Sequence, residues 1–142
     1  MSTLNIPCYA FSTRQASRRL SQFYEHRIIS TGVHAQQFTI LAIIEHKASI
    51  SLTELAEELG MDRTTLARNL KPMERDELLT ITPSKEDGRI KVIALTSIGK
   101  RKLKAARKKW QQAQADFEDK FGAERARKLR EELKAAAQAA SL

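Results

Sequence analysis

Two short amphipathic helix patterns, separated by a single turn, lie in the middle of the chain and restrict its fold more than any other feature. Ser51 and Glu54 stand at the spacing of a capping box, in which the serine hydroxyl accepts a hydrogen bond from a free amide of the first turn. Apolar residues recur at helical spacing from there to Leu59, and Gly60 tolerates the left-handed backbone that ends a helix. Asp62 follows as the N-cap of a second helix. We therefore expect a helix-turn-helix at this position.

The second of these helices has two chemically different sides. Leu66, Leu70 and Met73 fall on one side when residues advance by about 100° each. The opposite side is polar and basic, with Thr64, Arg68, Lys71 and Arg75. Pro72 removes one internal hydrogen bond, so a bend or a weakened last turn is expected. The apolar side should face a core, and the polar side should face solvent or a partner.

A β-hairpin with a charged tip is expected directly after this helix. Residues 78–82 and 89–95 are rich in Ile, Val and Thr, and the link between them contains Pro83 and the turn pair Asp87-Gly88. A helix-turn-helix followed by such a hairpin is a winged helix-turn-helix, whose second helix can enter the major groove of DNA.

Helical patterns flank this region on both sides. An amphipathic helix is expected over residues 9–29, a buried one over residues 35–46, and a long one beginning after Thr96. The long helix carries an apolar seam, and a last helix after Gly122 repeats the alternation of three and four. We expect the last helix to supply the partner of that seam. The predicted fold is mainly α with a small β-hairpin wing, in a single domain over residues 1–142.

Composition narrows the class of partner. The 142 residues include 25 Lys plus Arg against 17 Asp plus Glu, a net charge of +8, which favours a polyanion such as nucleic acid or an anionic membrane. The longest apolar runs are too short to span a bilayer and no signal peptide is evident, so a cytoplasmic location without membrane attachment is expected. One cysteine, Cys8, and three scattered histidines exclude an intrachain disulfide and give no metal-binding spacing, so no metal or cofactor is expected.

The polar side of the second helix suits base reading. Arg68 can pair bidentately with guanine and Asn69 with adenine, and the methyl group of Thr64 or Thr65 can touch thymine. Each residue alone is more often a solvated side chain, so the inference depends on the ordered set. Residues 61–91 hold seven basic and six acidic side chains. The DNA hypothesis therefore depends on where the basic groups point and not on local net charge.

Two further basic features accompany this helix. At the hairpin tip, Lys85 and Arg89 flank Asp87, so Arg89 can extend toward a narrow minor groove of DNA. The alternative is a solvated tip in which Arg89 only forms an ion pair with Asp87. Residues 100–109 hold seven basic side chains and no acidic one. They can contact phosphates beside the hairpin, line an anionic ligand site, or form a solvated helix face.

These motifs together resemble the MarR family of bacterial regulators. The likeness is carried by the stretch 51–65, by Leu70, by Asp87-Gly88-Arg89, and by Ala94-Leu95-Thr96 followed by Gly99. It extends over nearly the whole chain. It implies a sequence-specific DNA-binding regulator, in most members a repressor, that contacts successive major grooves of a pseudo-palindromic site. The residues it places on double-stranded DNA are Ser51, Arg63, Thr64, Thr65, Arg68, Asn69, Lys71, Lys85, Asp87 and Arg89.

The resemblance also implies a homodimer whose first and last helices intertwine. Residues 1–33 and 97–142 would then form the helical dimerisation region, and residues 34–96 the DNA-binding lobe. The side chains expected in the dimer contact are Leu20, Phe23, Trp110, Phe117, Phe121, Leu129 and Leu133.

Control of such regulators comes from a ligand or from oxidation. In the family a small molecule, often aromatic or a carboxylate, binds between the lobes and releases DNA, and here the candidate ligand residues are Tyr9, Thr13, Arg14 and His34. A branch that senses organic peroxides has a reactive cysteine near the start of its first helix, and Cys8 lies in a similar stretch. Those sensors carry paired tyrosines, whereas this chain has Ser12 and Gln22 at the matching spacings.

Two other classes of function are alternatives to the reading of DNA sequence. An enzyme is not expected, because the sequence contains no phosphate-binding glycine loop, metal cluster or nucleophile elbow. A helical adaptor that binds proteins through its long helices is the second alternative, since fold alone does not decide function. The polar outer side of the second helix argues against the adaptor, because protein-binding surfaces present apolar or aromatic anchors.

Overall fold

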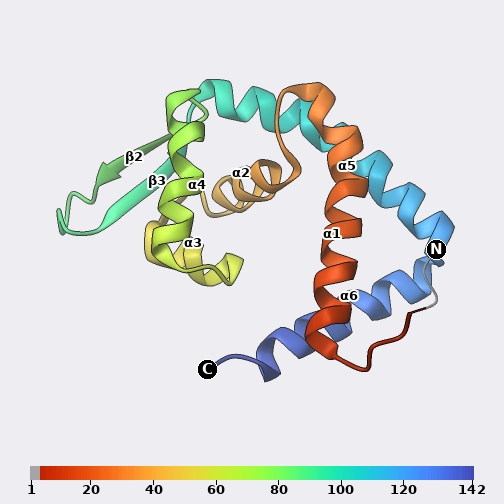
Figure 1. The fold of residues 1–142 in the computed structure, drawn as a ribbon. Coiled ribbons are helices and arrows are strands. Elements are labelled where there is room, and N and C mark those ends of the chain that lie inside the picture. Colours follow the sequence, from red (N-terminus) through yellow and green to blue (C-terminus); the bar gives the residue numbers. More distant parts are fainter. Residues whose placement is uncertain (1–3) are drawn as a thin grey trace.

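The computed structural model describes residues 4–142, which form a lobe and a set of long helical arms (Figure 1). The lobe contains α2, α3, α4 and a small sheet from which the β2–β3 hairpin projects, and the arms are α1, α5 and α6. The elements are α1 (Tyr9–Ile28), the 3-10 turn η1 (Ile29–Thr31), α2 (Ala35–Lys47), β1 (Ser49–Ser51), α3 (Leu52–Leu59), α4 (Arg63–Arg75), β2 (Leu79–Pro83), β3 (Lys91–Leu95), α5 (Ser97–Phe121) and α6 (Ala123–Ala139).

The core of the lobe is built around α2. Ile40, Leu41 and Ile44 of this helix are at most 1% exposed, so more than one of its sides is covered. The inner side of α4 is buried as predicted, because Leu66, Leu70 and Met73 all belong to the same cluster. The helix continues through Pro72, and the Asp76 amide donates to the Pro72 carbonyl at 2.9 Å. The expected two-sided character of α4 is therefore confirmed.

The sheet has a strand that the sequence analysis missed. It is antiparallel with the order β1-β3-β2, and Ile50 of β1 is paired with Ile93 of β3. The expected hairpin is present, but its strands are shifted to Leu79–Pro83 and Lys91–Leu95. Strand β1 is only three residues long, which is too short for an alternating pattern, and it ends at the serine that caps α3.

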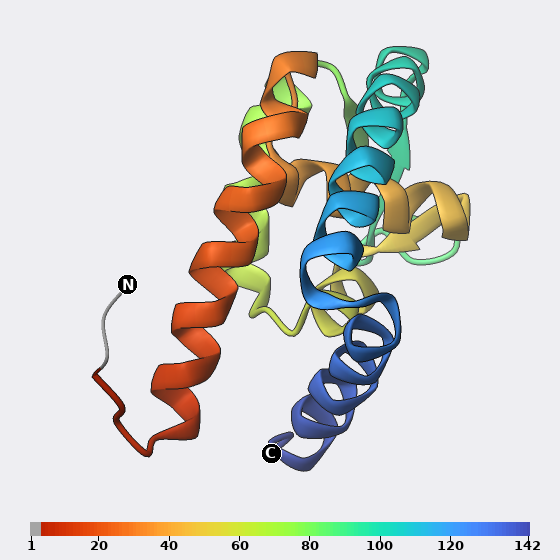
Figure 2. The same cartoon turned by 90° about the vertical axis from the view of Figure 1, so that its right-hand side faces the viewer.

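The two C-terminal helices do not pair along their length as expected. From Gly122, whose φ is +99°, α6 diverges from α5, and the two form a V in Figure 1 and follow each other end to end in Figure 2. The seam of α5 is instead covered by α1 and α2: Leu103 and Ala106 are fully buried in the core, and Trp110 stacks on Phe38 of α2 with ring centroids 5.7 Å apart. Helix α6 keeps most of its apolar residues at least partly exposed because the fold gives it no neighbour along its full length.

A close contact between the end of α4 and the start of α5 sets the position of the arms. The Leu78 carbonyl accepts a hydrogen bond from the Thr96 amide at 3.2 Å, and the Thr96 hydroxyl accepts one from the Gly99 amide at 3.0 Å. A Cβ atom placed on Gly99 would lie 1.9 Å from the Leu78 carbonyl oxygen. Glycine is therefore required here by close packing of backbone against backbone.

We predict that Gly99→Ala destabilises the protein by about 3 kcal/mol, the upper end of the range for overpacking, because backbone cannot move aside as a flexible side chain can. The matched control is Gly88→Ala, since nothing lies within 4 Å of a Cβ at that position. The check is urea denaturation of both variants. Equal stability of the two would show that α5 can shift without cost.

Candidate nucleic-acid interface

The helix-turn-helix is held by caps at both of its helix starts. The Ser51 hydroxyl accepts a hydrogen bond from the Glu54 amide at 3.1 Å, and it also lies 3.1 Å from the Glu54 carboxylate, to which it donates. Gly60 has the left-handed conformation with φ of +65°. Asp62 accepts from the amide and the hydroxyl of Thr65 at 2.8 and 2.7 Å. The side-chain and backbone bonds from Thr65 lower the pKa of Asp62, so the cap is a carboxylate at neutral pH.

The outer side of α4 separates into two groups of predicted DNA contacts. Arg63, Thr64, Arg68 and Lys71 are exposed. Thr65 and Asn69 are half-buried and bonded within the turn, Thr65 to Asp62 and Asn69 through its amide group to the Met61 sulfur at 3.5 Å. The first group is accessible to a partner, whereas the second has a structural role in the turn.

The hairpin tip holds Arg89 in one direction. Its Nε and Nη2 atoms each donate to a different oxygen of Asp87 at 3.1 Å, and its backbone amide donates to the same carboxylate at 3.0 Å. These bonds lower the pKa of Asp87 and raise that of Arg89. The Arg89 side chain is still 91% exposed, and Lys85 is exposed beside it. Asp87 therefore orients a cation that remains available to a polyanion.

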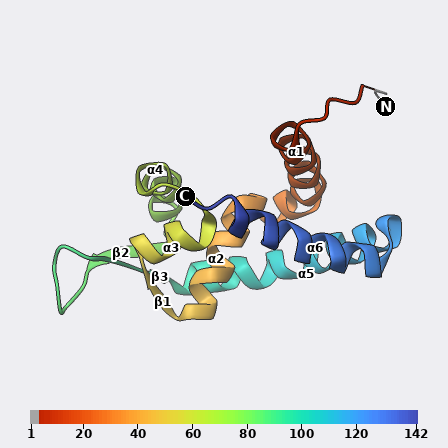
Figure 3. The same cartoon turned by 90° about the horizontal axis from the view of Figure 1, so that it is seen from below.

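The exposed side of α4 and the hairpin lie on the same lobe, but the basic run of α5 lies elsewhere. Figure 3 shows α4 on one side of α2 and α5 on the other, with the hairpin extending from the end of the lobe. Within the run 100–109, Arg107 pairs with Glu45 at 2.8 Å and Lys102 donates to the Thr31 carbonyl at 3.4 Å. Lys100 is exposed at the start of α5, next to the sheet. Part of this run thus ties α5 to its neighbours.

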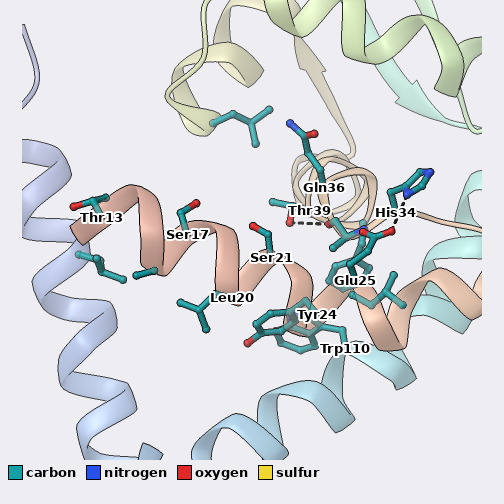
Figure 4. A pocket seen from close by; sticks show the side chains of 16 residues that line it. Thr13, Ser17, Leu20, Ser21, Tyr24, Glu25, His34, Gln36, Thr39 and Trp110 are labelled. Atoms are coloured by element: carbon teal, nitrogen blue, oxygen red, sulfur yellow. Dashed lines mark hydrogen bonds and ion pairs between the residues drawn. The ribbon is translucent and has the colours of Figure 1, made fainter. Parts of the chain in front are cut away.

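A groove of about 900 Å³ separates the lobe from the arms (Figure 4). Of the four candidate ligand residues, Thr13 and His34 line it, whereas Tyr9 and Arg14 do not. Tyr9 is 93% exposed. Leu59 of α3 and Leu133 of α6 are among the lining residues, so the groove touches both the helix-turn-helix and the arms.

Glu25 is a polar residue of this groove that the sequence analysis did not identify. Its carboxylate accepts from the Ala35 amide at 2.8 Å and lies 2.7 Å from Nδ1 of His34, so a residue of α1 caps α2. Burial acts to raise the pKa of Glu25, but the bonds to Ala35 and His34 outweigh it and the pKa is lowered. The polar residues Thr13, Ser17, Ser21 and Glu25 recur every four positions along α1, a signal that could have revealed this wall.

The predicted dimer residues fall in two places. Phe23 of α1 meets Phe117 of α5 edge to face at 6.2 Å, and Phe121 stacks on Phe117 at 5.3 Å. Cations lie over this cluster, with Arg125 4.2 Å from the ring of Phe121. Leu20, Trp110 and Leu133 instead line the groove, and Leu129 is half-buried on α6.

Cys8 is the N-cap of α1, and its thiol is exposed. Its sulfur accepts a hydrogen bond from the Phe11 amide at 3.5 Å. The thiol is therefore accessible to an oxidant, and the redox role stays a prediction.

The part of the chain from residue 4 to 142 has no helix long and apolar enough to cross a membrane. Over the same residues, no three His, Cys, Asp or Glu side chains come together as a metal site.

Comparison with known proteins matches this arrangement to DNA-binding regulators. The sequence model of the MarR family matches residues 33–91. The M. tuberculosis transcriptional regulator MosR, solved in complex with DNA, is 36% identical, with a TM-score of 0.82 over 95% of this chain and 99% of that one. The transcriptional repressor CouR, bound to a 23-mer DNA duplex, is 22% identical over 96% of this chain and 99% of that chain; its TM-score of 0.84 shows the shared fold.

A curated relative is also similar over part of its length. The organic hydroperoxide resistance transcriptional regulator of Bacillus subtilis is 29% identical over 84 residues, which are 59% of this chain and 57% of that protein. The chain spans about half the length of the curated relatives it matches, 48% to 57%.

We predict that Ser51 has two separable roles, which its substitutions distinguish. Ser51→Ala removes the cap of α3 and should cost about 1 kcal/mol of stability, whereas Ser51→Asp keeps a cap. If the serine also lies against a phosphate, the aspartate variant should be as stable as the parent protein and still bind DNA more weakly, because like charges repel. The checks are urea denaturation and fluorescence anisotropy with labelled duplex. If Ser51→Asp binds DNA as tightly as the parent protein, Ser51 acts only as the cap of α3.

Proposed function

Because the chain belongs to the MarR family of transcriptional regulators, which bind DNA, we propose that it acts as a homodimeric repressor of a pseudo-palindromic operator and releases DNA when a small molecule enters the groove. One observation carries the DNA-reading part. Four polar or basic side chains share the exposed side of α4, and a fixed arginine stands on the adjacent hairpin.

Base reading is assigned to the accessible group on α4. Arg68 suits a bidentate pair with guanine, and the methyl group of Thr64 suits contact with thymine. Arg63 and Lys71, also exposed, are placed at phosphates, and Arg89 at the neighbouring minor groove. Thr65 and Asn69 support the turn, so their contribution to reading is indirect.

Homodimerisation is proposed from the apolar surface left on the arms. Ile6, Tyr9 and Leu133 are 40%, 93% and 45% exposed, and they belong to the segment before α1, to α1 and to α6. A second copy that covers these residues would remove this surface from water. In this arrangement residues 1–33 and 97–142 join the two copies, and residues 34–96 of each copy contact one half-site.

Repression and release follow from where the groove lies. A bound dimer would block the operator, and the spacing of its two α4 helices would have to match about one turn of DNA, roughly 10 bp. The groove has Leu59 of α3 on one side and Leu133 of α6 on another. A ligand that binds the groove more tightly when the lobes stand at a different distance from each other stabilises that conformation. The fraction of dimers whose two α4 helices match the spacing of the operator then falls, and DNA is released.

We predict different effects for two basic residues. Arg68→Ala should weaken operator binding by about 1–3 kcal/mol and relax the preference at one base position, because it removes a base contact. Lys100→Ala should weaken binding evenly for all sequences, because a lysine at this position can meet only phosphates. The check is anisotropy against duplexes with every single-base change in one half-site. A uniform loss for Arg68→Ala would rule out base reading by that residue.

We further predict that the chain sediments as a dimer at micromolar concentration and that Leu133→Glu weakens the dimer. The matched control is Ile90→Glu, since Ile90 has the same 45% exposure but lies at the base of the hairpin tip, outside the arms. A stable monomer in sedimentation, or equal effects of the two variants, would contradict the proposed interface.

A further inference from the structure

We infer that the groove binds an aromatic molecule carrying a positive charge, such as an arylalkyl ammonium ion, rather than one carrying an acid group. This inference deepens the effector part of the proposed function and rests on it.

The charge of the groove wall is the first observation. No lysine or arginine lines the groove among the residues that the structure describes, although the whole chain has 25 of them. Arg14, the one arginine among the four candidate ligand residues, is outside the wall, and so is the basic run 100–109. The fixed charge in the wall is the carboxylate of Glu25. A ligand acid would therefore meet a like charge and no permanent cation, which is costly in a partly desolvated site.

The geometry of Glu25 is the second observation. The Ala35 amide at 2.8 Å and His34 at 2.7 Å fix its two oxygens, one each, and its side chain is still 35% exposed. Each carboxylate oxygen can accept more than one hydrogen bond, so both keep capacity for a donor in the groove. His34 is bonded to Glu25 through Nδ1 and is directed to that carboxylate, as Figure 4 shows. The wall therefore presents a pre-oriented acceptor to a ligand ammonium group.

The apolar part of the wall is the third observation. Trp110 and Phe38 stack with centroids 5.7 Å apart, and Tyr24 lines the same groove. Aromatic rings both cover an apolar ligand ring and attract a cation held over their faces. The side chains of Ser17 and Ser21 project from α1 on the same side as Thr13 and add hydroxyl groups to the wall. An aromatic ring with one cationic end matches these surfaces together.

The test uses three probes of one shape and three charges: 2-naphthylmethylammonium, 2-naphthalenemethanol and 2-naphthoate. Binding to the full chain is measured by calorimetry without DNA, because a cation also binds DNA, and operator release is then measured by anisotropy. We expect the ammonium probe to bind at least about tenfold more tightly than the naphthoate, the difference that one charge-assisted hydrogen bond supplies.

Two variants test which residue makes the groove prefer a cationic ligand, and a third variant serves as a control. Glu25→Gln keeps an acceptor for the Ala35 amide but removes the negative charge. It should lower the affinity for the ammonium probe about tenfold and leave the affinity for the alcohol probe unchanged. Thr39→Lys places a cation at an exposed position of the wall, and this variant should bind naphthoate more tightly than the ammonium probe. Glu45→Gln removes a carboxylate of α2 that pairs with Arg107 outside the groove, and it should change none of the three affinities.

The outcomes separate this inference from the proposed function. Naphthoate binding as tightly as the ammonium probe and releasing operator DNA would overturn the inference and leave ligand release standing. An unchanged ammonium affinity in Glu25→Gln would overturn the assignment of the charge to Glu25. Tight ammonium binding without release of operator DNA would support the groove chemistry and contradict the effector part of the proposed function.

Discussion

The carbonyl oxygen of Leu78 accepts a hydrogen bond from the Thr96 amide and occupies the space that a side chain on Gly99 would need. The Thr96 hydroxyl adds a bond to the carbonyl of Glu77, a residue held at φ of +60°, and caps α5 through the Gly99 amide. This contact joins the end of α4, the base of the hairpin and the start of the longest helix. The lobe is therefore fixed to α5 by backbone contacts that leave little freedom. If two copies assemble through the arms as proposed, a change in the distance between those arms would reach α4 as a movement of the whole lobe.

Local chemistry made the lobe predictable from sequence. The caps at Ser51, Asp62 and Thr96, and the buried side of α4, follow from hydrogen-bonding groups and periodicity within a few residues, and all of them are present in the structure. Strand β1 was missed because its partner, β3, lies about 40 residues away and three residues carry no period of their own. The pairing of α6 with α5 was wrong because periodicity identifies an apolar side and does not identify what covers it: α1 and α2 cover α5, and Trp110 packs against Phe38.

In the candidate site, too, features set by nearby residues were predictable and features set by distant contacts were not. The exposed residues of α4 were identified from helix geometry, but the bonding of Thr65 and Asn69 within the turn depends on side-chain choices that periodicity does not determine. The groove could be placed only loosely, because its wall is assembled from elements far apart in the chain. Glu25 acquires its role through the α2 terminus ten residues later, and this contact exists only once η1 and Gly32 have turned the chain back. The same residue makes the wall acidic in a chain that is basic overall.

In the proposed function, two copies of this lobe read DNA sequence together. Selection of binding sites from a randomised duplex pool at about 150 mM salt, where weak phosphate contacts are screened, tests it without assuming an operator. We expect enrichment of an inverted repeat whose half-sites are about one helical turn, roughly 10 bp, apart. A folded protein that enriches no sequence, or that enriches a single half-site only, would contradict it.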